Sequence, residues 1–382
     1  MRRDWITVCG MSILLVVLTA GCVLPMDAVY SLPEDLQGKL SPWEADIYFL
    51  EHELPRRHIN VYHTLSEPEY RAGIAELKAL CPEMSDEERW VAISSFVASI
   101  GDSHTQYSIP FTHAYPLNLT VTKEGAFVTA ALEENRGLVR DSGEAVMAEL
   151  VAIDGMPIAP SGDGGSVYET LYPVLSHEND GAFRESLSSA LLHPGLLYGA
   201  GITDKADSCE MTFRYQNGDT TTVELAAREL SGFRELDWVV YYDDSYPADR
   251  SVLPYYLRYS GSLYWGSWLA GEQTLYVLYN RCANAEEQSF RAFIDELSRL
   301  TEGEIVEKIV VDLRNNSGGN SEVIRPLYAL IANDLPDAAL YAIIDATTFS
   351  SALMNAVTLK YTYNAVLVGE PAGGRPNHYG EI

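Results

Sequence analysis

Within residues 41–116, hydrophobic positions recur at the spacing of an α-helix. Ile47, Leu50 and Leu54 illustrate the pattern, because residues three or four apart lie on one face of a helix. Ser85 is followed by three acidic residues, which is typical of a helix start, where a serine oxygen caps free amides and carboxylates favour the helix dipole. The segment is therefore predicted to form a small helical domain.

From residue 117 the pattern shortens to that of strands, and residues 117–230 are predicted to form a β-rich domain. Its Asn217-Gly218 pair favours a tight hairpin turn. Residues 149–158 resemble the late strand and turn of a PDZ domain, a module that adds peptide C-termini to a sheet edge. A β-rich spacer domain is the alternative. The predicted strands span residues 117–122, 126–131, 150–153, 209–215 and 220–225.

In residues 231–382, strands and helices alternate, which is typical of an α/β domain with right-handed crossovers and a largely parallel sheet. Functional side chains gather at the carboxyl ends of strands in such sheets. We therefore expect the active site here. The predicted strands span residues 275–279, 305–313, 340–344 and 365–368, and the predicted helices span residues 286–300, 322–332 and 350–360.

The N-terminus has the order of a secretion signal: Arg2 and Arg3, an apolar run over residues 11–18, then small residues up to Cys22. The run is shorter than the ~20 apolar residues of a membrane-spanning helix. Its end resembles a bacterial lipobox, which implies removal of residues 1–21 and acylation of Cys22. We expect an extracytoplasmic, lipid-anchored protein with a linker over residues 22–40; an ordinary cleaved signal and an uncleaved anchor are the alternatives.

The net charge of −28 excludes classes of protein that bind polyanions, because phosphate backbones repel such a chain. We therefore expect no nucleic-acid partner.

The five cysteines have no C-x-x-C spacing, so neither a metal site nor a dense disulfide framework is predicted. At 382 residues the chain exceeds what one hydrophobic core usually organises, which favours two or three domains.

The most specific motif is Asp312-Leu313-Arg314-Asn315-Asn316-Ser317-Gly318-Gly319, at the end of a predicted buried strand. A glycine-bearing turn there allows backbone amides to approach a ligand closely. The string resembles the D-L-R-x-N-x-G-G pattern of the C-terminal-processing serine peptidases at every fixed position. The resemblance implies that Gly318 supplies an oxyanion-hole amide and that Gly319 lies at the substrate.

A second motif, Thr347-Thr348-Phe349-Ser350-Ser351-Ala352, lies between a predicted strand and a predicted helix. A serine at such a turn is exposed in the positive field of the helix N-terminus, although a simple N-cap serine is the alternative interpretation. In the same peptidase family the first serine after Thr-x is the nucleophile. The resemblance thus implies Ser350 as nucleophile and the Ser351 amide as the other oxyanion donor.

A serine nucleophile needs a base at neutral pH. In the tail-specific branch of the family the base is a lysine after a Gly-Glu-Pro turn. Here Gly369-Glu370-Pro371 leads to Arg375 at that position, and arginine does not give up its proton in proteins. Arg375 and His378 are instead predicted to lie at the substrate; a residue of a turn is the equal alternative for His378.

The tricorn-like branch takes its base from a distant Ser-His pair within a Gly-Asp-x-His-Thr pattern. This chain has the pattern as Gly101-Asp102-Ser103-His104-Thr105. Histidine suits proton transfer near neutral pH, so the resemblance implies His104 as base and Ser103 as the residue that orients its imidazole. Asp102 is expected to brace the turn. A structural histidine at a domain boundary is the alternative, and no residue is identified as the glutamate that tricorn-like enzymes also use.

The combined resemblance implies a multidomain α/β serine endopeptidase with a C-terminal crotonase-like domain, acting on proteins or peptides without metal or organic cofactor. Because relatives continue through further strands, the chain is expected to be truncated at Ile382. The alternatives are an inactive adaptor and a binding protein for an apolar ligand, like the interphotoreceptor retinoid-binding proteins, with residues 255–268 lining its pocket. The oligomeric state is left open.

Overall fold

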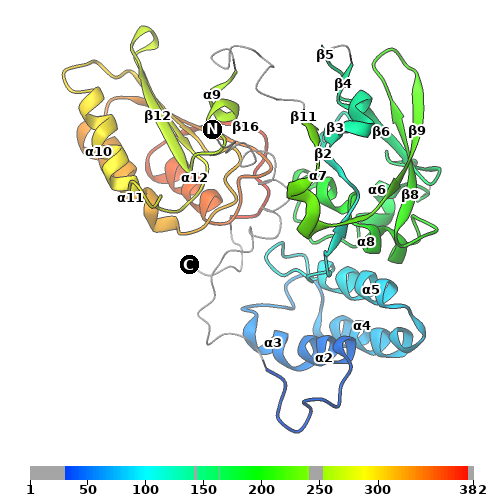
Figure 1. The fold of residues 1–382 in the computed structure, drawn as a ribbon. Helices are drawn as coiled ribbons and strands as arrows, with labels where there is room; N and C mark the ends of the chain where they lie inside the picture. The colour runs from blue at the N-terminus through cyan, green and yellow to red at the C-terminus, as the bar shows by residue number, and fades with distance from the viewer. Residues whose placement is uncertain (1–30, 142–143, 163, 241–252, 377–382) are drawn as a thin grey trace. The chain divides into compact units, whose positions relative to one another are not determined.

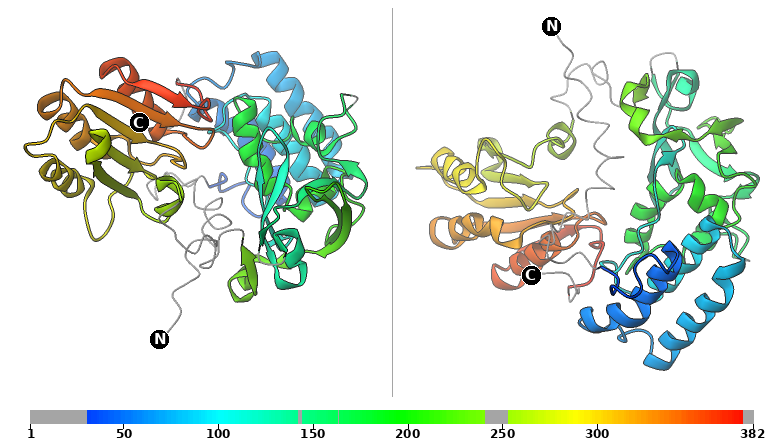
Figure 2. Two further views of the ribbon diagram at one scale, coloured as in Figure 1. Left: turned by 90° about the horizontal axis from the view of Figure 1, so that it is seen from above. Right: turned by 60° about the horizontal axis from the view of Figure 1, so that its bottom comes forward.

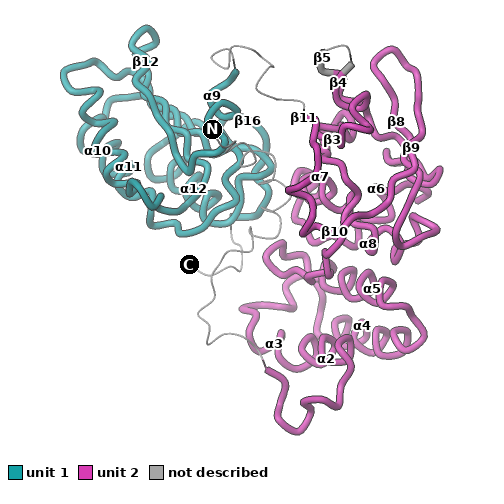
Figure 3. Tube along the Cα trace, viewed as in Figure 1, with its two compact units in different colours: residues 1–22, 244–382 teal, residues 23–243 magenta. Residues whose placement is uncertain are grey.

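The computed structural model describes residues 31–141, 144–162, 164–240 and 253–376. The chain divides into two compact units, drawn in different colours in Figure 3. Unit 1 consists of Asp244–Ile382 with Met1–Cys22, and unit 2 of Val23–Asp243. In the described residues, one cluster of buried hydrophobic side chains lies in unit 1 and two lie in unit 2. The predicted domain limits at residues 116 and 230 stay predictions.

The first part of unit 2 is helical, as the spacing of its hydrophobic residues predicts. Ser41, Ser66 and Ser85 each begin a helix, and each is paired with a glutamate three residues later in a reciprocal capping box, which confirms the helix start expected at Ser85. The helices are α2 (Pro42–Tyr48), α3 (Leu54–Arg57), α4 (Glu67–Leu80) and α5 (Asp86–Ala98), with a π-turn over Phe49–Glu53 and a 3₁₀ turn over Cys81–Glu83.

The second part of unit 2 is built on an antiparallel sheet with the strand order β11-β3-β6-β8-β9, in which β2 pairs with β3 and β7 with β6. The Asn-Gly turn joins β8 to β9, as predicted. The strands of this unit are β1 (His113–Ala114), β2 (Leu117–Val121), β3 (Ala126–Leu132), β4 (Arg140–Asp141), β5 (Glu144–Ala145), β6 (Glu149–Ile153), β7 (Met156–Pro157), β8 (Ser208–Arg214), β9 (Thr220–Ala226), β10 (Arg228–Glu229) and β11 (Trp238–Val240).

Three helices lie where the sequence pattern gave no element: α6 (Val167–Leu171), α7 (Asp180–Ala190) and α8 (Pro194–Gly199). The helices α6 and α8 span five and six residues, too few for an apolar spacing to stand out in the sequence. Phe183, Leu187 and Leu197 join the core beneath the sheet. The helices form because this shared core covers their apolar sides.

Unit 1 contains a five-stranded sheet with the order β12-β13-β14-β15-β16. The three pairings from β13 to β16 are parallel and β12 is antiparallel to β13, which confirms the prediction of a largely parallel sheet. The strands are β12 (Tyr264–Leu269), β13 (Thr274–Tyr279), β14 (Lys308–Asp312), β15 (Ala339–Ile344) and β16 (Val366–Gly369), and the helices are α9 (Tyr255–Arg258), α10 (Phe290–Leu300), α11 (Arg325–Ala329) and α12 (Ser351–Thr362).

The helices α10, α11 and α12 follow one another along the sheet in the order of the strands they connect, as Figures 1 and 2 show. Leu275, Val277 and Tyr279 of β13 are buried in the core that these helices share with the sheet. Between them, Tyr276 points to the opposite face, because side chains alternate along a strand, and it contacts Tyr255. Both faces of β13 are therefore covered.

The predicted helix over residues 322–332 is wrong in detail. A 3₁₀ turn over Ser321–Ile324, the short α11 and a π-turn over Leu330–Asp334 replace it. Pro326 explains the break, since it has no amide proton to donate to the carbonyl four residues earlier and its ring crowds that carbonyl. Likewise α10 begins only after Ser289, whose side chain accepts a hydrogen bond from the Ala292 amide.

In the described part of the chain, no helix is long and apolar enough to cross a membrane. Cys22, the predicted site of acylation, and His378, a predicted substrate contact, lie outside the described residues. The predictions for both therefore rest on the sequence.

His193 is expected to make the stability of unit 2 depend on pH. It is buried at the start of α8, its Nδ1 atom accepts a hydrogen bond from the Leu196 amide, and burial lowers its pKa to about 4. Below its ordinary pKa the unfolded chain binds a proton that the folded chain excludes. We therefore expect the free energy of unfolding to fall as pH drops from about 6.5 to about 4, by up to about 3 kcal/mol from this residue.

The test compares chemical unfolding across this pH window for wild type and His193→Asn, which keeps a capping acceptor but does not titrate. The variant should lose the extra pH dependence. His113→Asn, at an exposed position, serves as the control and should titrate like wild type. Equal pH dependence in all three proteins would contradict the prediction.

Candidate active site

Ser350 lies at the turn between β15 and α12, with φ 51° and ψ −126°. Positive φ is strained for a residue with a side chain. Ser350 takes the N-cap position, yet its side chain makes no capping hydrogen bond and the residue is half-buried. A capping serine has an extended backbone and accepts from an amide in the first turn. The geometry is instead that of a serine held on a strained strand-to-helix turn, with its hydroxyl not used for capping.

Hydrogen bonds from neighbouring residues hold the strained turn in place. One carboxylate oxygen of Asp345 accepts from the Thr347 hydroxyl at 2.7 Å and from the Thr347 and Thr348 amides at 3.0 and 3.2 Å. A residue in such a backbone region costs about 1–3 kcal/mol and persists only when its surroundings fix it. The Asp345 carboxylate supplies that constraint.

The glycine motif and the serine turn are hydrogen-bonded to each other. The Thr348 hydroxyl donates to the Leu313 carbonyl at 3.0 Å, and the Phe349 amide donates to the Asn316 carbonyl at 3.0 Å. In addition, the Asn315 amide donates to the Thr347 hydroxyl at 2.8 Å. The two turns follow the carboxyl ends of β14 and β15, which are neighbouring parallel strands. Both turns therefore lie at the same edge of the sheet.

Gly318 approaches Ser350 more closely than a larger residue would allow. A Cβ atom at position 318 would lie 2.8 Å from the Cβ of Ser350 and 3.0 Å from the amide nitrogen of Ser351, and Gly318 has φ 106°. The Ser351 hydroxyl donates to the Gly319 carbonyl at 2.6 Å. Unit 1 therefore brings together four predicted site residues: Ser350, Ser351, Gly318 and Gly319.

The two predicted oxyanion donors differ in their present partners. The Ser351 amide belongs to the first residue of α12, so it has no acceptor within the helix, and it donates to no acceptor among the described residues. The Gly318 amide donates to Oδ1 of the buried Asn316 at 2.9 Å. Binding of an oxyanion by Gly318 requires this hydrogen bond to be shared or broken. In the sequence, Asn316 is a fixed position of the glycine motif, and no role is predicted for its side chain.

The strand that leads into the glycine motif ends on a buried carboxylate. Asp312 accepts three side-chain hydrogen bonds from Arg314: from Nε to Oδ1 at 3.0 Å and to Oδ2 at 3.2 Å, and from Nη2 to Oδ2 at 2.6 Å. It accepts another from the Tyr276 hydroxyl at 2.5 Å. The Arg314 guanidinium lies 3.9 Å from the ring centroid of Tyr256. Burial, with the Asp312 charge, raises the pKa of Tyr276, which keeps its hydroxyl protonated and donating. These bonds fix the end of β14.

Cys282 lies behind the glycine motif. Its amide donates to the Gly318 carbonyl at 3.1 Å, and its carbonyl accepts from the Asn320 amide at 2.7 Å. Burial raises the pKa of its thiol to about 11. The thiol is therefore neutral near pH 7 and serves packing rather than nucleophilic chemistry.

The segment that carries Arg375 runs past the serine turn. The Glu370 amide donates to the Ile344 carbonyl at 3.0 Å, and the Gly373 amide donates to the Thr348 carbonyl at 3.1 Å. Arg375 itself is exposed. Its predicted contact with substrate stays a prediction.

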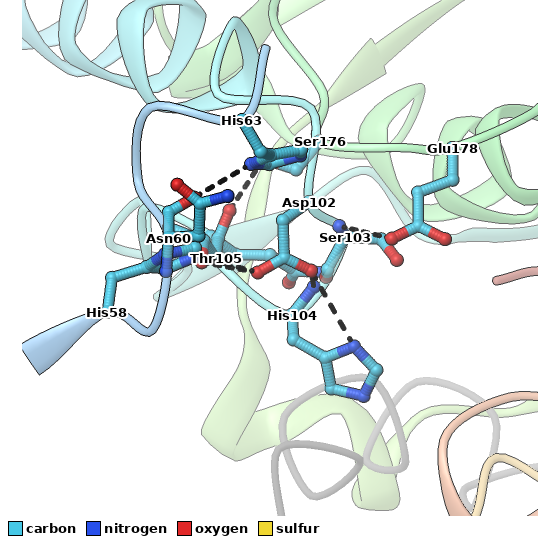
Figure 4. A network of polar contacts seen from close by, with 10 residues as sticks. His58, Asn60, His63, Asp102, Ser103, His104, Thr105, Ser176 and Glu178 are labelled. Atoms are coloured by element: carbon cyan, nitrogen blue, oxygen red, sulfur yellow. Dashed lines mark hydrogen bonds and ion pairs between the residues drawn. The ribbon is translucent and has the colours of Figure 1, made fainter. Parts of the chain in front are cut away.

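His104 and Ser103 lie in unit 2, on the turn that follows α5 (Figure 4). The turn is organised around Asp102, whose side chain is 1% exposed. Its Oδ1 atom accepts from the His104 amide at 3.0 Å, and its Oδ2 atom accepts from the Thr105 hydroxyl at 2.7 Å. This is the bracing of the turn expected from the sequence.

Asp102 also contacts two imidazoles. His58 Nε2 lies 3.3 Å from Oδ2, and His104 Nδ1 lies 3.9 Å from Oδ1. Burial raises the pKa of Asp102, but the hydrogen bonds from Thr105, His104 and His58 outweigh this effect, so the net pKa is lowered. The carboxylate is therefore ionised at neutral pH. No feature of the sequence pattern near the motif points to His58, which lies 44 residues earlier.

Ser103 presents its backbone rather than its side chain to a partner. The Ser103 amide donates to the Glu178 carboxylate at 3.3 Å, whereas its hydroxyl is buried and makes no hydrogen bond to a described residue. The orienting role of Ser103 toward the imidazole stays a prediction.

Three aromatic residues of the segment 255–268 pack against one another: Tyr255, Tyr259 and Trp265. Tyr259 stacks on Trp265 with ring centroids 3.9 Å apart, and Tyr255 lies 4.9 Å from Trp265 and 5.1 Å from Tyr276. Their aromatic character is thus explained by packing on the sheet. Among the described residues, no three His, Cys, Asp or Glu side chains are grouped so as to hold a metal ion.

No protein-family model matches the sequence, and no curated protein matches it. Solved structures do match. Mature CPAF is 15% identical, with a TM-score of 0.54 over 86% of this chain and 83% of that chain. Mature CPAF complexed with lactacystin gives the same identity and TM-score over 86% and 84%. The chain has the fold of the C-terminal-processing (S41) peptidases.

The photosystem II D1 C-terminal processing protease also matches, at 12% identity and a TM-score of 0.38 over 87% of this chain and 82% of that chain. The S41 fold rests on the CPAF match. At 15% identity that match shows the fold alone.

Strain at Ser350 is testable without any assay of activity. Ser350→Gly should raise the free energy of unfolding by about 1 kcal/mol, because glycine adopts positive φ without the strain of a side chain, partly offset by its larger unfolded-state entropy. Ser350→Ala keeps the strain and should leave stability within about 0.5 kcal/mol of wild type. Urea unfolding measures both.

Ser351→Gly is the matched control, because Ser351 is helical and its hydroxyl is hydrogen-bonded to Gly319. It should destabilise the protein by about 1 kcal/mol or more. A Ser350→Gly protein less stable than Ser350→Ala would contradict the strained turn.

Proposed function

We propose that the protein is a serine endopeptidase that hydrolyses proteins or peptides through an acyl-enzyme on Ser350. One observation carries the proposal. In a chain with the S41 peptidase fold, Ser350 lies on a strained turn close to the backbone of Gly318, and its hydroxyl makes no capping hydrogen bond. The neighbouring Ser351 amide donates to no acceptor among the described residues. A serine nucleophile beside backbone amides that can bind an oxyanion is the minimal arrangement for acyl transfer.

In the proposed reaction, the Ser350 hydroxyl oxygen attacks the carbonyl carbon of the scissile peptide bond while His104 accepts its proton. The Ser351 and Gly318 amides bind the oxyanion, the latter after release from Asn316. His104 then returns the proton to the leaving amine, and the acyl-enzyme forms. Water, activated by the same imidazole, releases the acid and restores the serine.

The proposal assigns the base to a residue of unit 2 and the nucleophile to unit 1. It therefore requires the imidazole of His104 to come within about 2.6–3.2 Å of the Ser350 hydroxyl during catalysis. The sequence motif supports His104, and so does its contact with an ionised carboxylate. Ser103 is proposed to orient the ring, and Gly319, Arg375 and His378 to contact the substrate.

The finer architecture belongs to the proposal as well. A PDZ-like middle domain would capture substrate ends at a sheet edge, and a crotonase-like domain would carry out the hydrolysis. We also propose that the protein is extracytoplasmic and anchored by a lipid on Cys22. The anchor is supported by the N-terminal sequence pattern.

Activity-based labelling and peptidase assays test the nucleophile and base. A serine-directed fluorophosphonate should label wild type, and not Ser350→Ala. Ser350→Ala and His104→Ala should each lower kcat/KM on the order of 10⁶-fold, and the double variant should lose little more, because the pair acts as a unit. His113→Ala, at an exposed position, is the control and should keep full activity.

Labelling that persists in Ser350→Ala would refute the assigned nucleophile. Losses that multiply in the double variant would refute the pairing of His104 with Ser350.

Metabolic labelling tests the anchor. A palmitate analogue should mark wild type and not Cys22→Ala, because Cys22 ends the lipobox-like pattern. Cys81→Ala, a buried position, is the matched control and should label like wild type. Equal labelling of wild type and Cys22→Ala would exclude the lipid anchor.

A further inference from the structure

His58 is held in a defined tautomer. The Asn60 amide donates to its Nδ1 atom at 3.1 Å, so that nitrogen is the acceptor. A neutral imidazole then carries its proton on Nε2. That atom lies 3.3 Å from Oδ2 of Asp102, with the His58 side chain 5% exposed. The local backbone thus directs a proton of His58 at the buried carboxylate.

The loop that carries His58 is itself fixed. The His58 amide donates to the Leu54 carbonyl at 2.9 Å at the end of α3. The His63 ring lies parallel to that of His58 with centroids 6.2 Å apart, and His63 Nδ1 lies 3.0 Å from the Asn60 carbonyl oxygen. The imidazole of His58 therefore has little freedom to leave Asp102.

The two carboxylate oxygens of Asp102 contact different groups. Oδ2 is bound by His58 and Thr105, while Oδ1 binds the His104 amide and faces His104 Nδ1 at 3.9 Å (Figure 4). A buried carboxylate needs such partners to stay charged. The facing nitrogen is Nδ1, the one that a histidine base keeps protonated while its Nε2 atom accepts the proton of the nucleophile.

We propose that His58 is a positioning residue for His104, acting through Asp102. In this relay His58 holds Asp102 ionised and oriented, and Asp102 stabilises the imidazolium that forms when His104 accepts a proton. The catalytic part rests on the proposed function of His104 as base. The electrostatic coupling of the three residues does not depend on that function.

Other titratable groups lie around the relay. Glu178 accepts a hydrogen bond from the Ser103 amide, and the His63 ring lies beside that of His58. Of the groups named here, Asp102 is the one that contacts the His104 ring. Removing the Asp102 carboxylate should therefore change the pKa of His104 more than removing any of the others.

The test follows the His104 imidazole by NMR across pH in the full-length protein, with its resonance assigned by its loss in His104→Gln. Asp102→Asn should lower the pKa of His104 by about 1–3 units, because an opposite charge near the ring is removed. His58→Asn, too short to reach Asp102, should lower that pKa by a smaller amount. His58→Gln, whose amide nitrogen replaces Nε2, should restore the wild-type value.

The acid limb of the kcat/KM profile should move with the NMR pKa in each variant, with KM changed little. His113→Gln, at an exposed position outside the relay, is the control and should change neither. If Asp102→Asn or His58→Asn leaves the His104 titration unchanged, the relay is overturned. A purely structural role for His58 would likewise be shown by a His58→Gln variant that behaves like His58→Asn.

The NMR readout separates this inference from the proposed function. Coupled titration in a protein without peptidase activity would keep the relay and refute the function. Uncoupled titration in a protein whose activity needs His104 would refute the relay and keep the function.

Discussion

The parallel register of β14 and β15 is the constraint on which the candidate site depends. Lys308 pairs with Ala339 at one end and Asp312 with Ile343 at the other, so both strands reach the same edge of the sheet. The glycine motif follows one strand and the serine turn follows the other. A shift of two residues in this register would move the turns apart by about 6–7 Å and break the hydrogen bonds between them.

The close approach of Gly318 to Ser350 and the backbone strain at Ser350 occur at the same place in the structure. Gly318 lies so near Ser350 that a Cβ atom would overlap with it, and Ser350 is left with a positive φ. Asp345, Thr347 and Thr348 offset the strain through a local network of hydrogen bonds. The result is a hydroxyl that makes no capping hydrogen bond and lies just before Ser351, the first residue of α12.

Both units use a buried aspartate in the same physical way. Asp312 is held by Arg314 and Tyr276, and Asp102 by Thr105 and His58 with the His104 amide. In each case the desolvation cost of a buried charge is offset by several donors. The outcomes differ: Asp312 fixes the end of a strand, whereas Asp102 leaves one oxygen facing an imidazole and so has a means to act on its titration.

The sequence by itself determined the parts of this protein whose cause is local. Alternation of strands and helices predicted the parallel sheet, Ser85 with its acidic turn predicted the start of α5, and the Asn217-Gly218 pair predicted the β8 to β9 hairpin. Only the tertiary structure decided that the Gly318 amide is held by Asn316 and that His58 reaches Asp102. Periodicity and turn chemistry act within a few residues, whereas these contacts arise when packing brings side chains together across a turn or across 44 positions of the chain.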